Sequence, residues 1–394
     1  MKRYSSLVVA VFLMFSLEVP YTFAASNIKI GLLLPVSGIL AFEGSSMREG
    51  FSLRLKEENY QIGDSKIEVI VEDTEAKPAV GATKARKLVE KDNVALLAGC
   101  YSSAVALAVR NYAHEAKIPY VIIAGGTTLS LSYENKSPYV YRCSTAAPQY
   151  LIGLAEYLYK ERKYRKGVVM VTDYAYGHDT LKGFTKDFTR QGGQIIQSFA
   201  VPLRSVDFAS YLPKIDTSAD FVYADFVGAD AIHLVKQYKS YGMWNKLPLV
   251  GGPLIMQEFL EAEGDAAIGI EGCMYYSAES ETPENRAFVK RYMTEYNKVP
   301  PAVSASAYEG GTAIVMALKA IEKKGYEKEA FLRALSKVTF VGPRGPFRFE
   351  EGTNSVISAN FIYRCVKKDG RMLLEVIKTV PNTSASMARA LIID

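Results

Sequence analysis

Residues 28–34, with the sequence IKIGLLL, are almost wholly apolar and form the clearest predicted strand of the chain. A short apolar run of this kind is typical of a strand that is covered on both faces, as in a parallel sheet. Residues 45–60 follow, with Met47, Phe51 and Leu55 spaced four residues apart, which predicts a helix with one apolar face. The strand and the helix together predict the first βα unit of a parallel sheet.

The same alternation of strands and helices continues in two series. In the first series, strands are expected at 66–71, 94–98 and 120–124, and helices at 78–91 and 103–116. After a polar stretch, the second series has expected strands at 167–172, 194–201, 221–225 and 249–251, and helices at 149–160, 178–191, 208–214 and 230–241. An open sheet of about ten strands usually splits, so the pattern favours two doubly wound α/β domains over one large sheet.

The pattern changes after residue 273. Two long helices are expected there, at 284–296 and 302–324, without a strong strand between them. The simplest arrangement returns the chain to the first domain and crosses again near 347–360, so that strands at 361–367 and 374–380 complete the second. We therefore expect a hinge of three crossings beside a ligand cleft, with a first domain of 26–142 plus 275–350 and a second of 143–274 plus 351–394.

Composition agrees with an ordinary globular protein. The chain has 394 residues, of which 49% are hydrophobic and 23% are charged, and a length of this size favours two domains. The formal net charge of +5 is too small to indicate a nucleic-acid partner. Composition therefore leaves the function to local motifs.

The first 25 residues are predicted to be a secretory signal. Lys2 and Arg3 precede an apolar stretch at 7–17, and small residues follow up to Ala24 and Ala25, near which cleavage is expected. The apolar stretch is too short to span a bilayer, and no later stretch is longer. We therefore expect an exported protein, free in its compartment because no cysteine near the cleavage site could carry a lipid.

Cysteines and histidines give no sign of a metal centre or another cofactor. No Cys-x-x-Cys motif occurs, and the three histidines are far apart in the sequence, so neither a metal site nor a cofactor is expected. The four cysteines allow three full disulfide pairings, and they could equally be buried as free thiols. The sequence alone does not choose among these alternatives. The cysteines are Cys100, Cys143, Cys273 and Cys365.

Two turns after neighbouring strands carry donors suited to an anion. Ser102 and Ser103 follow one strand at the start of a helix, where hydroxyls and backbone N–H groups can meet a carboxylate. Thr127 and Thr128 follow the next strand, after two glycines that let the backbone approach a ligand closely. The alternative role of these hydroxyls is to cap helices and turns only.

Several segments, in order along the chain, resemble one family. They are IGLLLPVSG at 30–38, EDT at 72–74, GCYSS at 99–103, IP at 118–119, DYAYG at 173–177, Pro202 with Asp207 and Phe208, and Tyr308. This set resembles the extracytoplasmic solute-binding proteins of the branched-chain amino acid (leucine/isoleucine/valine) uptake type, with the type I periplasmic-binding fold. The resemblance implies a monomeric, non-enzymatic protein that closes over a small hydrophobic carboxylate. It also implies a location in the periplasm and delivery to the permease and ATPase subunits of an ABC importer.

The resemblance also implies site residues. In the first domain it indicates Ser103, a carbonyl from Ala124 and a threonine, with Thr127 and Thr128 left as alternatives. In the second domain it indicates Tyr176 as a ring that closes over the ligand. Further walls of the cleft are expected from Phe42 or Glu43 in the first loop, from Phe226 or Val227 after Asp225, and from Tyr101 and Leu254.

One position departs from the family pattern. Relatives that bind α-amino acids have an acid after the strand at 249–251 to pair the ammonium group, whereas this chain has Pro253 and Leu254. Either Asp225, Asp230 or Glu309 takes that role, or the ligand has no ammonium group. An aromatic or other non-amino carboxylate is therefore an alternative ligand.

A secreted α/β hydrolase is the alternative from another class. Asp173 and His178 could combine with Ser102 as a triad, but the sequence lacks the Gly-x-Ser-x-Gly elbow and the other common catalytic motifs. The histidine is better explained as a polar residue at the start of a helix. The sequence therefore favours a binding protein over an enzyme.

Overall fold

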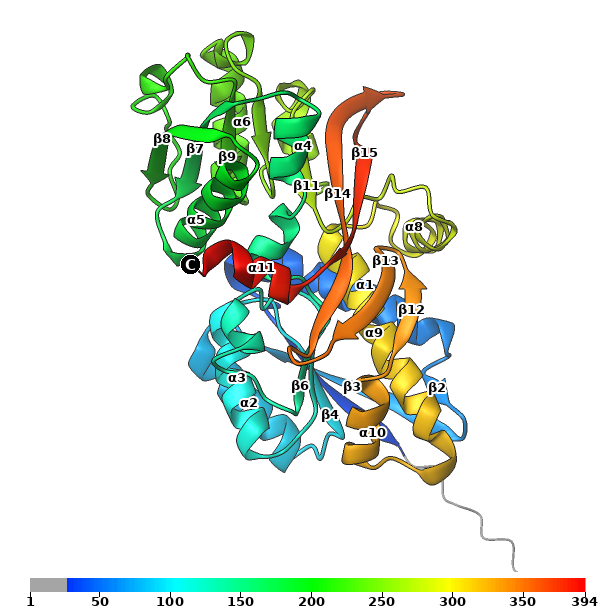
Figure 1. Cartoon of the computed structure of the whole chain (residues 1–394). Helices are drawn as coiled ribbons and strands as arrows, with labels where there is room; N and C mark the ends of the chain where they lie inside the picture. Colours follow the sequence, from blue (N-terminus) through cyan, green and yellow to red (C-terminus); the bar gives the residue numbers. More distant parts are fainter. Residues whose placement is uncertain (1–26, 394) are drawn as a thin grey trace, which may run out of the picture.

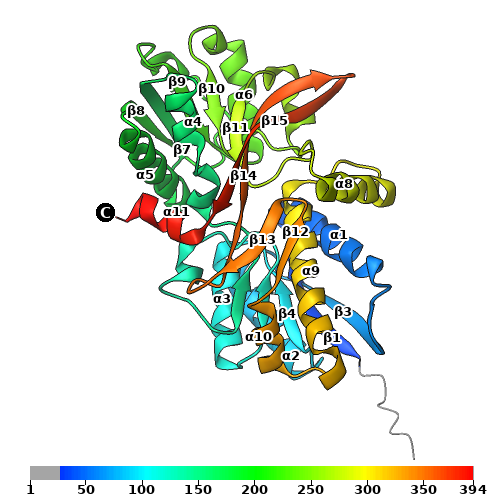
Figure 2. The ribbon, with the colours of Figure 1, turned by 45° about the vertical axis from the view of Figure 1, so that its right-hand side comes forward.

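The computed structural model describes residues 27–393, and its elements form two lobes (Figures 1 and 2). The predicted signal sequence lies outside the described residues. Within the described part of the chain, no helix is both long and apolar enough to cross a membrane.

The first lobe is a parallel sheet covered on both faces. Its strands lie in the order β2 (Gln61–Ile62), β3 (Ser65–Asp73), β1 (Ile28–Leu34), β4 (Leu96–Gly99), β5 (Tyr120–Ile122) and β6 (Val140–Arg142). Only the β2–β3 pair is antiparallel among these. Helices α2 (Pro78–Glu90) and α3 (Ser103–Glu115) cover one face, and α1 (Ala41–Glu57), α9 (Ala302–Ile321) and α10 (Lys328–Leu335) the other (Figure 1).

Strand β1 shows why the run IKIGLLL forms a central strand. Ile30, Leu32 and Leu34 pack into the core beneath α1 and α9, whereas Leu33 points into the core beneath α2 and α3. Successive side chains of a strand point to opposite faces, so a strand between two helical layers must be apolar at nearly every position.

The second lobe repeats this plan. Its parallel strands lie in the order β11 (Glu271–Met274), β10 (Leu249–Gly251), β9 (Phe221–Asp225), β7 (Lys166–Thr172) and β8 (Gln194–Val201). Helices α4 (Leu154–Lys160), α5 (Ala175–Arg190), α6 (Ala229–Ser240) and α7 (Leu260–Glu263) belong to this lobe. The predicted fold class, two doubly wound α/β units, is confirmed.

Three segments join the lobes. The chain passes from β6 into the second lobe at 143–146 and returns after β11 through α8 (Pro283–Tyr296) to α9. The third crossing lies inside one long strand, β14 (Ser355–Lys368), as Figure 2 shows. Its first part pairs with β13 (Gly345–Glu350), which pairs in turn with β12 (Thr339–Gly342). Its later part pairs with β11 and β15 (Arg371–Thr383).

A buried ion pair lies where these crossings meet. Both side chains of the Arg344–Glu309 pair are buried, and the guanidinium Nη2 lies 2.7 Å from Glu309 Oε2. The same nitrogen donates to the carbonyl of Cys143 in the first crossing at 2.7 Å. Breaking a buried pair leaves an uncompensated charge, so this contact ties the first lobe to the start of the second.

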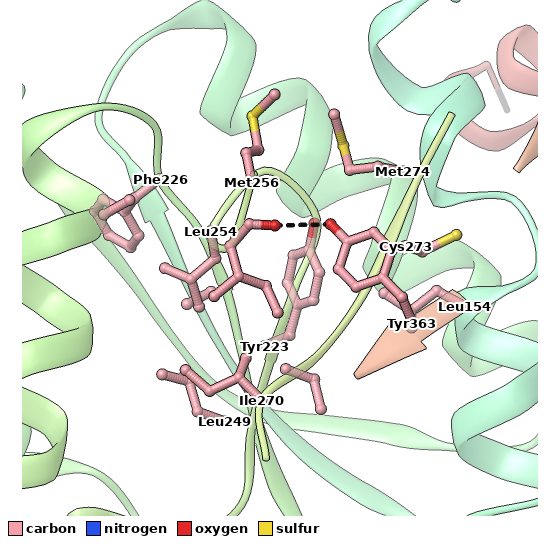
Figure 3. Packing of buried hydrophobic residues seen from close by; sticks show 14 of the residues in the cluster. Leu154, Tyr223, Phe226, Leu249, Leu254, Met256, Ile270, Cys273, Met274 and Tyr363 are labelled. Carbon is pink, nitrogen blue, oxygen red and sulfur yellow. Dashed lines mark hydrogen bonds between the residues drawn. The ribbon is translucent and has the colours of Figure 1, made fainter. Parts of the chain in front are cut away.

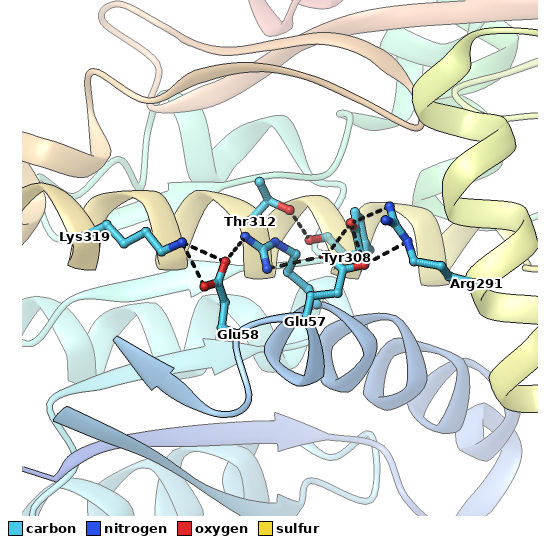
Figure 4. A network of polar contacts seen from close by, with 7 residues as sticks. Glu57, Glu58, Arg291, Tyr308, Thr312 and Lys319 are labelled. Carbon is cyan, nitrogen blue, oxygen red and sulfur yellow. Dashed lines mark hydrogen bonds and ion pairs between the residues drawn. The ribbon is translucent and has the colours of Figure 1, made fainter. Parts of the chain in front are cut away.

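A second polar network holds α1 against α9 (Figure 4). The Tyr308 hydroxyl donates to Glu57 at 2.9 Å, and Arg291 from α8 pairs with the same carboxylate at 3.0 Å. Next to it, Glu58 accepts from Arg54 at 2.7 Å and pairs with Lys319 at 2.8 Å. The network joins α8, which follows the second crossing, to the helices of the first lobe.

Two expected helices differ from the structure. The helix predicted at 208–214 is wrong, because only a 3₁₀ turn at Leu212–Lys214 forms there, with Phe208 buried as an anchor and Pro213 lacking a backbone N–H. The helix predicted from residue 149 begins only at Leu154, since Gly153 takes a φ of +98° that ends a preceding 3₁₀ turn. The C-terminal residues form a helix, α11 (Ala385–Ile392), packed against α5.

The four cysteines are buried and unpaired. Burial raises the pKa of the Cys100 thiol to about 12, with the same direction at the other three. They therefore act as small apolar side chains rather than as reactive thiols.

Candidate ligand-binding site

The two donor-bearing turns of the first lobe touch each other. Gly126 N donates a hydrogen bond to the carbonyl of Tyr101 at 2.7 Å, which joins the turn after β5 to the turn after β4. A side chain at Gly125 would place its Cβ 2.3 Å from the same carbonyl oxygen, and this residue has a φ of +68°. Only glycine fits here, so the backbone of the second turn can reach the first.

Three hydroxyls on these turns have no hydrogen-bond partner among residues 27–393: those of Ser102, Ser103 and Thr127. Ser102 is the N-cap of α3, yet its side chain makes no capping bond. Thr128 differs, because its hydroxyl accepts from Ser130 N at 3.3 Å and its carbonyl accepts from Arg142 at 2.7 Å. The unpartnered hydroxyls lie beside the N-terminus of a 13-residue helix, a place that favours an anion.

In the second lobe, the hydroxyl of Tyr176 is already used. It donates to Asp225 Oδ1 at 2.9 Å, while Tyr223 and Tyr150 donate to Oδ2 at 2.8 and 3.3 Å. Burial raises the pKa of Asp225 to about 6, although these three phenols oppose the shift. Tyr176 can therefore offer its ring to a ligand, next to the ring of Tyr174 at a centroid distance of 5.6 Å.

Charged and aromatic groups from both lobes meet between these turns. Burial raises the pKa of Tyr101 well above its usual value, and the charges of Glu43 and Glu258 raise it further. The same two carboxylates raise the pKa of Tyr275, which follows β11. Glu43 belongs to α1 of the first lobe and Glu258 to the second, so charges of both lobes act on these two phenols.

Arg344 borders this region from the hinge. Its guanidinium lies 5.6 Å from the centroid of the Tyr275 ring, and its Nη1 is buried without a hydrogen-bond partner among residues 27–393. These segments thus combine aromatic rings with hydrogen-bonding groups that the protein itself leaves open, a combination that small-molecule sites commonly have.

Comparison with known proteins identifies this architecture. Residues 27–371 match the family model described as "Periplasmic binding protein". The chain belongs to this periplasmic binding protein family. Proteins of the family bind small molecules and act with ABC transporters, which is therefore the general role of this chain.

Three similar proteins place the chain within the family. "Leu/Ile/Val-binding protein homolog 6" of Brucella suis is 30% identical, over 88% of this chain and 89% of that protein. An ABC transporter substrate-binding protein from Sphaerobacter thermophilus is 33% identical with a TM-score of 0.88, over 91% and 99% of the two chains. A solute-binding protein from R. palustris, solved in complex with 4-hydroxybenzoate, is 26% identical with a TM-score of 0.83, over 91% and 98%.

Two expected wall residues of this periplasmic binding protein lie elsewhere. Phe226 and Leu254 are both fully buried in the core of the second lobe, where Figure 3 shows Leu254 among its apolar neighbours. Phe226 packs edge-on against Phe208, because the end of β9 turns this ring inward. The side chains of Val227 and Phe42 are 42% and 45% exposed. Ala124 is fully buried where the turn after β5 begins.

The three acids considered as partners for an ammonium group are all occupied. Asp225 holds the three phenols, Asp230 accepts from Arg204 N at 2.9 Å, and Glu309 pairs with Arg344. Sequence reasoning missed Glu258, the single acid in the apolar stretch GGPLIMQEFL at 251–260. An isolated carboxylate among apolar residues was the available signal.

The hydrolase alternative has no support from the family or from the geometry. His178 and Asp173 are 2.9 Å apart, but both side chains are about half exposed. Within residues 27–393 no hydrogen bond joins His178 to Ser102, so these residues do not assemble a triad. In the same part of the chain no three His, Cys, Asp or Glu side chains are grouped as metal ligands.

Proposed function

We propose that this protein captures a small aromatic carboxylate in the cleft between its lobes and passes it to the permease of an ABC importer. The observation that carries the proposal is the set of unpartnered hydroxyls on Ser102, Ser103 and Thr127. Hydroxyl donors next to a helix N-terminus can replace the water shell of a carboxylate with charge-assisted hydrogen bonds. The ligand carboxylate would therefore bind to the first lobe.

An aromatic ligand is supported by the walls of the cleft. Tyr101 in the first lobe and Tyr174, Tyr176 and Tyr275 in the second supply rings that can stack on a planar ligand. The relative from R. palustris was solved with 4-hydroxybenzoate, which has the matching chemistry.

A branched-chain amino acid is the second candidate. It is supported by the Brucella suis relative, whose name refers to leucine, isoleucine and valine, and by Glu258, which could pair with an ammonium group. Calorimetry on ligand-stripped protein separates the two candidates, because 4-hydroxybenzoate and leucine can be titrated into the same sample.

Hinge closure is the mechanism that we propose. The first lobe binds the carboxylate, and the rings of the second lobe reach it only when the hinge closes, so the ligand favours the closed state by its differential affinity. The three segments that join the lobes support this motion. The division into a first domain of 26–142 plus 275–350 and a second of 143–274 plus 351–394 is part of the proposal. Export through the predicted signal sequence and action as a monomer in the periplasm are parts of the same proposal.

The test measures both ligand binding and the overall size of the protein. We expect 4-hydroxybenzoate to give measurable heat and small-angle scattering to report a smaller radius of gyration when the protein is saturated. Heat from leucine alone would replace the aromatic ligand with the amino acid. An unchanged scattering curve at saturation would contradict hinge closure. Native mass spectrometry of the purified protein would identify any solute that it retains.

A further inference from the structure

Glu258 lies on a loop that the second lobe holds rigidly. The loop follows β10, and Leu254 and Ile255 fix it by full burial in the core. The hydroxyl of Tyr363 donates to the carbonyl of Ile255 at 2.9 Å (Figure 3) and to that of Gly252 at 3.2 Å. The loop is thus held at both its backbone and its side chains, and Glu258 stands at its end before α7.

The carboxylate of Glu258 has an oxygen that the protein leaves open. Oε2 is sealed from solvent and has no hydrogen-bond partner among residues 27–393. Burying a carboxylate oxygen without a partner is unfavourable, so native proteins usually supply one. The other buried acids named above, Asp225 and Glu309, have partners.

Glu258 lies on the loop after β10, at the carboxyl edge of the second-lobe sheet, where the segments that carry Tyr176 after β7 and Tyr275 after β11 also begin. The charge of Glu258 acts on Tyr101, and the charge of Glu43 acts on Glu258 in return. Glu263 is another acid whose carboxylate is buried without a partner among residues 27–393, and the charges that shift its pKa, Glu258 and Lys236, belong to its own lobe. The open oxygen of Glu258 is therefore placed where a ligand between the lobes can reach it.

We infer that Glu258 is a specificity-determining residue whose open carboxylate oxygen accepts a hydrogen bond from an N–H or O–H group at the far end of the ligand. This inference rests on the proposed function, since it requires the ligand carboxylate to bind at Ser102, Ser103 and Thr127. Burial raises the pKa of Glu258 to about 7, with a further contribution from the negative charge of Glu43. Above this pH the ionised carboxylate only accepts hydrogen bonds. The site therefore favours acids with a donor, such as a phenol or an ammonium group, over plain hydrocarbon acids.

Two matched ligand pairs test the inference by calorimetry on the full mature chain. 4-Hydroxybenzoate differs from benzoate by its phenol, and leucine differs from 4-methylpentanoate by its ammonium group. The wild type should prefer the donor-bearing member of at least one pair about tenfold or more, because a site built for a donor rejects the analogue that lacks it. The pair that shows the preference identifies the donor.

Variants connect the preference to Glu258. Glu258→Leu should reduce the ratio of the two dissociation constants to about one, and Glu258→Gln should do the same for an ammonium ligand but less for a phenol. Glu261→Leu, an exposed neighbour, is the matched control and should keep the wild-type ratio. A merely structural role would change the melting temperature and both affinities of a pair together.

The outcomes separate this inference from the proposed function. Equal binding of both members of each pair by the wild type would overturn the inference and leave the carboxylate site intact. An unchanged ratio in Glu258→Leu would also overturn it. Failure of all four acids to bind would overturn the proposed function and this inference with it.

Discussion

The two lobes differ in whether their polar groups have hydrogen-bond partners within the protein. In the second lobe, Asp225 and the phenols around it satisfy one another. In the first lobe, the hydroxyls of Ser103 and Thr127 have no partner within residues 27–393. A satisfied network stabilises and rigidifies the fold, whereas open donors are available to a ligand. The difference distinguishes groups that hold the wall from groups that bind.

The largest effect is expected from breaking the satisfied side. Asp225→Ala leaves the three phenols without their acceptor, so the free energy of unfolding should fall by about 3–5 kcal/mol. Urea unfolding measures this loss. Asp64→Ala, an exposed acid of the first lobe, should change stability by less than about 0.5 kcal/mol. Similar small changes in both variants would contradict a structural role for Asp225.

Glu263 is an exception within the second lobe, because both of its carboxylate oxygens are buried without a partner among residues 27–393. Burial raises the pKa of Glu263 from 4.5 to about 8. The folded state therefore binds the proton more tightly than the unfolded state, and the stabilisation is lost as pH rises from about 4.5 to about 8. Unfolding free energy should fall by about 3–4 kcal/mol between pH 5 and pH 8.

Glu263→Gln is the test of this assignment. The amide cannot ionise, so its stability should depend less on pH than that of the wild type. Glu261→Gln, which changes an exposed acid on the same helix, should retain the wild-type slope. Parallel pH profiles for Glu263→Gln and the wild type would show that another group is responsible.

The open side should respond in affinity instead of stability. Ser103→Ala removes a charge-assisted donor and should weaken carboxylate binding by about 1–3 kcal/mol, with an unchanged melting temperature. Ser210→Ala, an exposed serine of the second lobe, should leave affinity unchanged. Calorimetry and thermal unfolding on the same samples provide both numbers. Undiminished affinity in Ser103→Ala would remove this hydroxyl from the site.

The smallest effects come from two adjacent threonines with opposite roles. Thr127→Val should weaken binding about fivefold without loss of stability, since its hydroxyl has no internal partner within the described chain. Thr128→Val removes the hydroxyl that accepts from Ser130 N and should lower stability by about 1 kcal/mol with little change in affinity. The reverse pattern would make Thr128 the ligand-binding residue.

Much of the fold could be predicted because local pattern sets it. The strands expected at 28–34, 194–201, 221–225 and 249–251 have the predicted bounds. Strands β12 and β13 and helix α10 were not predicted, because each is short and depends on its packing partners: β12 pairs with β13, β13 pairs with β14, and α10 packs on α9.

The candidate site was less predictable than the fold. The segment GCYSS joins strand β4 to helix α3, as predicted, and residues that join a strand to a helix lie at the carboxyl edge of the sheet. Its role in ligand binding stays a prediction. Phe226 and Leu254 were expected in the cleft but are buried in the core. The direction of a side chain just beyond a strand depends on how the chain turns there, which no local pattern specifies.

The sequence by itself determined most of the strand and helix order, the fold class and the turns that carry donors, because periodicity and glycine placement act over a few residues. Only the tertiary structure decided which polar groups are satisfied. Phenols from three separate segments surround Asp225, Arg142 donates to the carbonyl of Thr128, and Glu258 has a carboxylate oxygen that is sealed from solvent without a partner within residues 27–393. Partners of this kind are brought together by packing between distant parts of the chain, and the availability of a group to a ligand depends on whether such a partner is present.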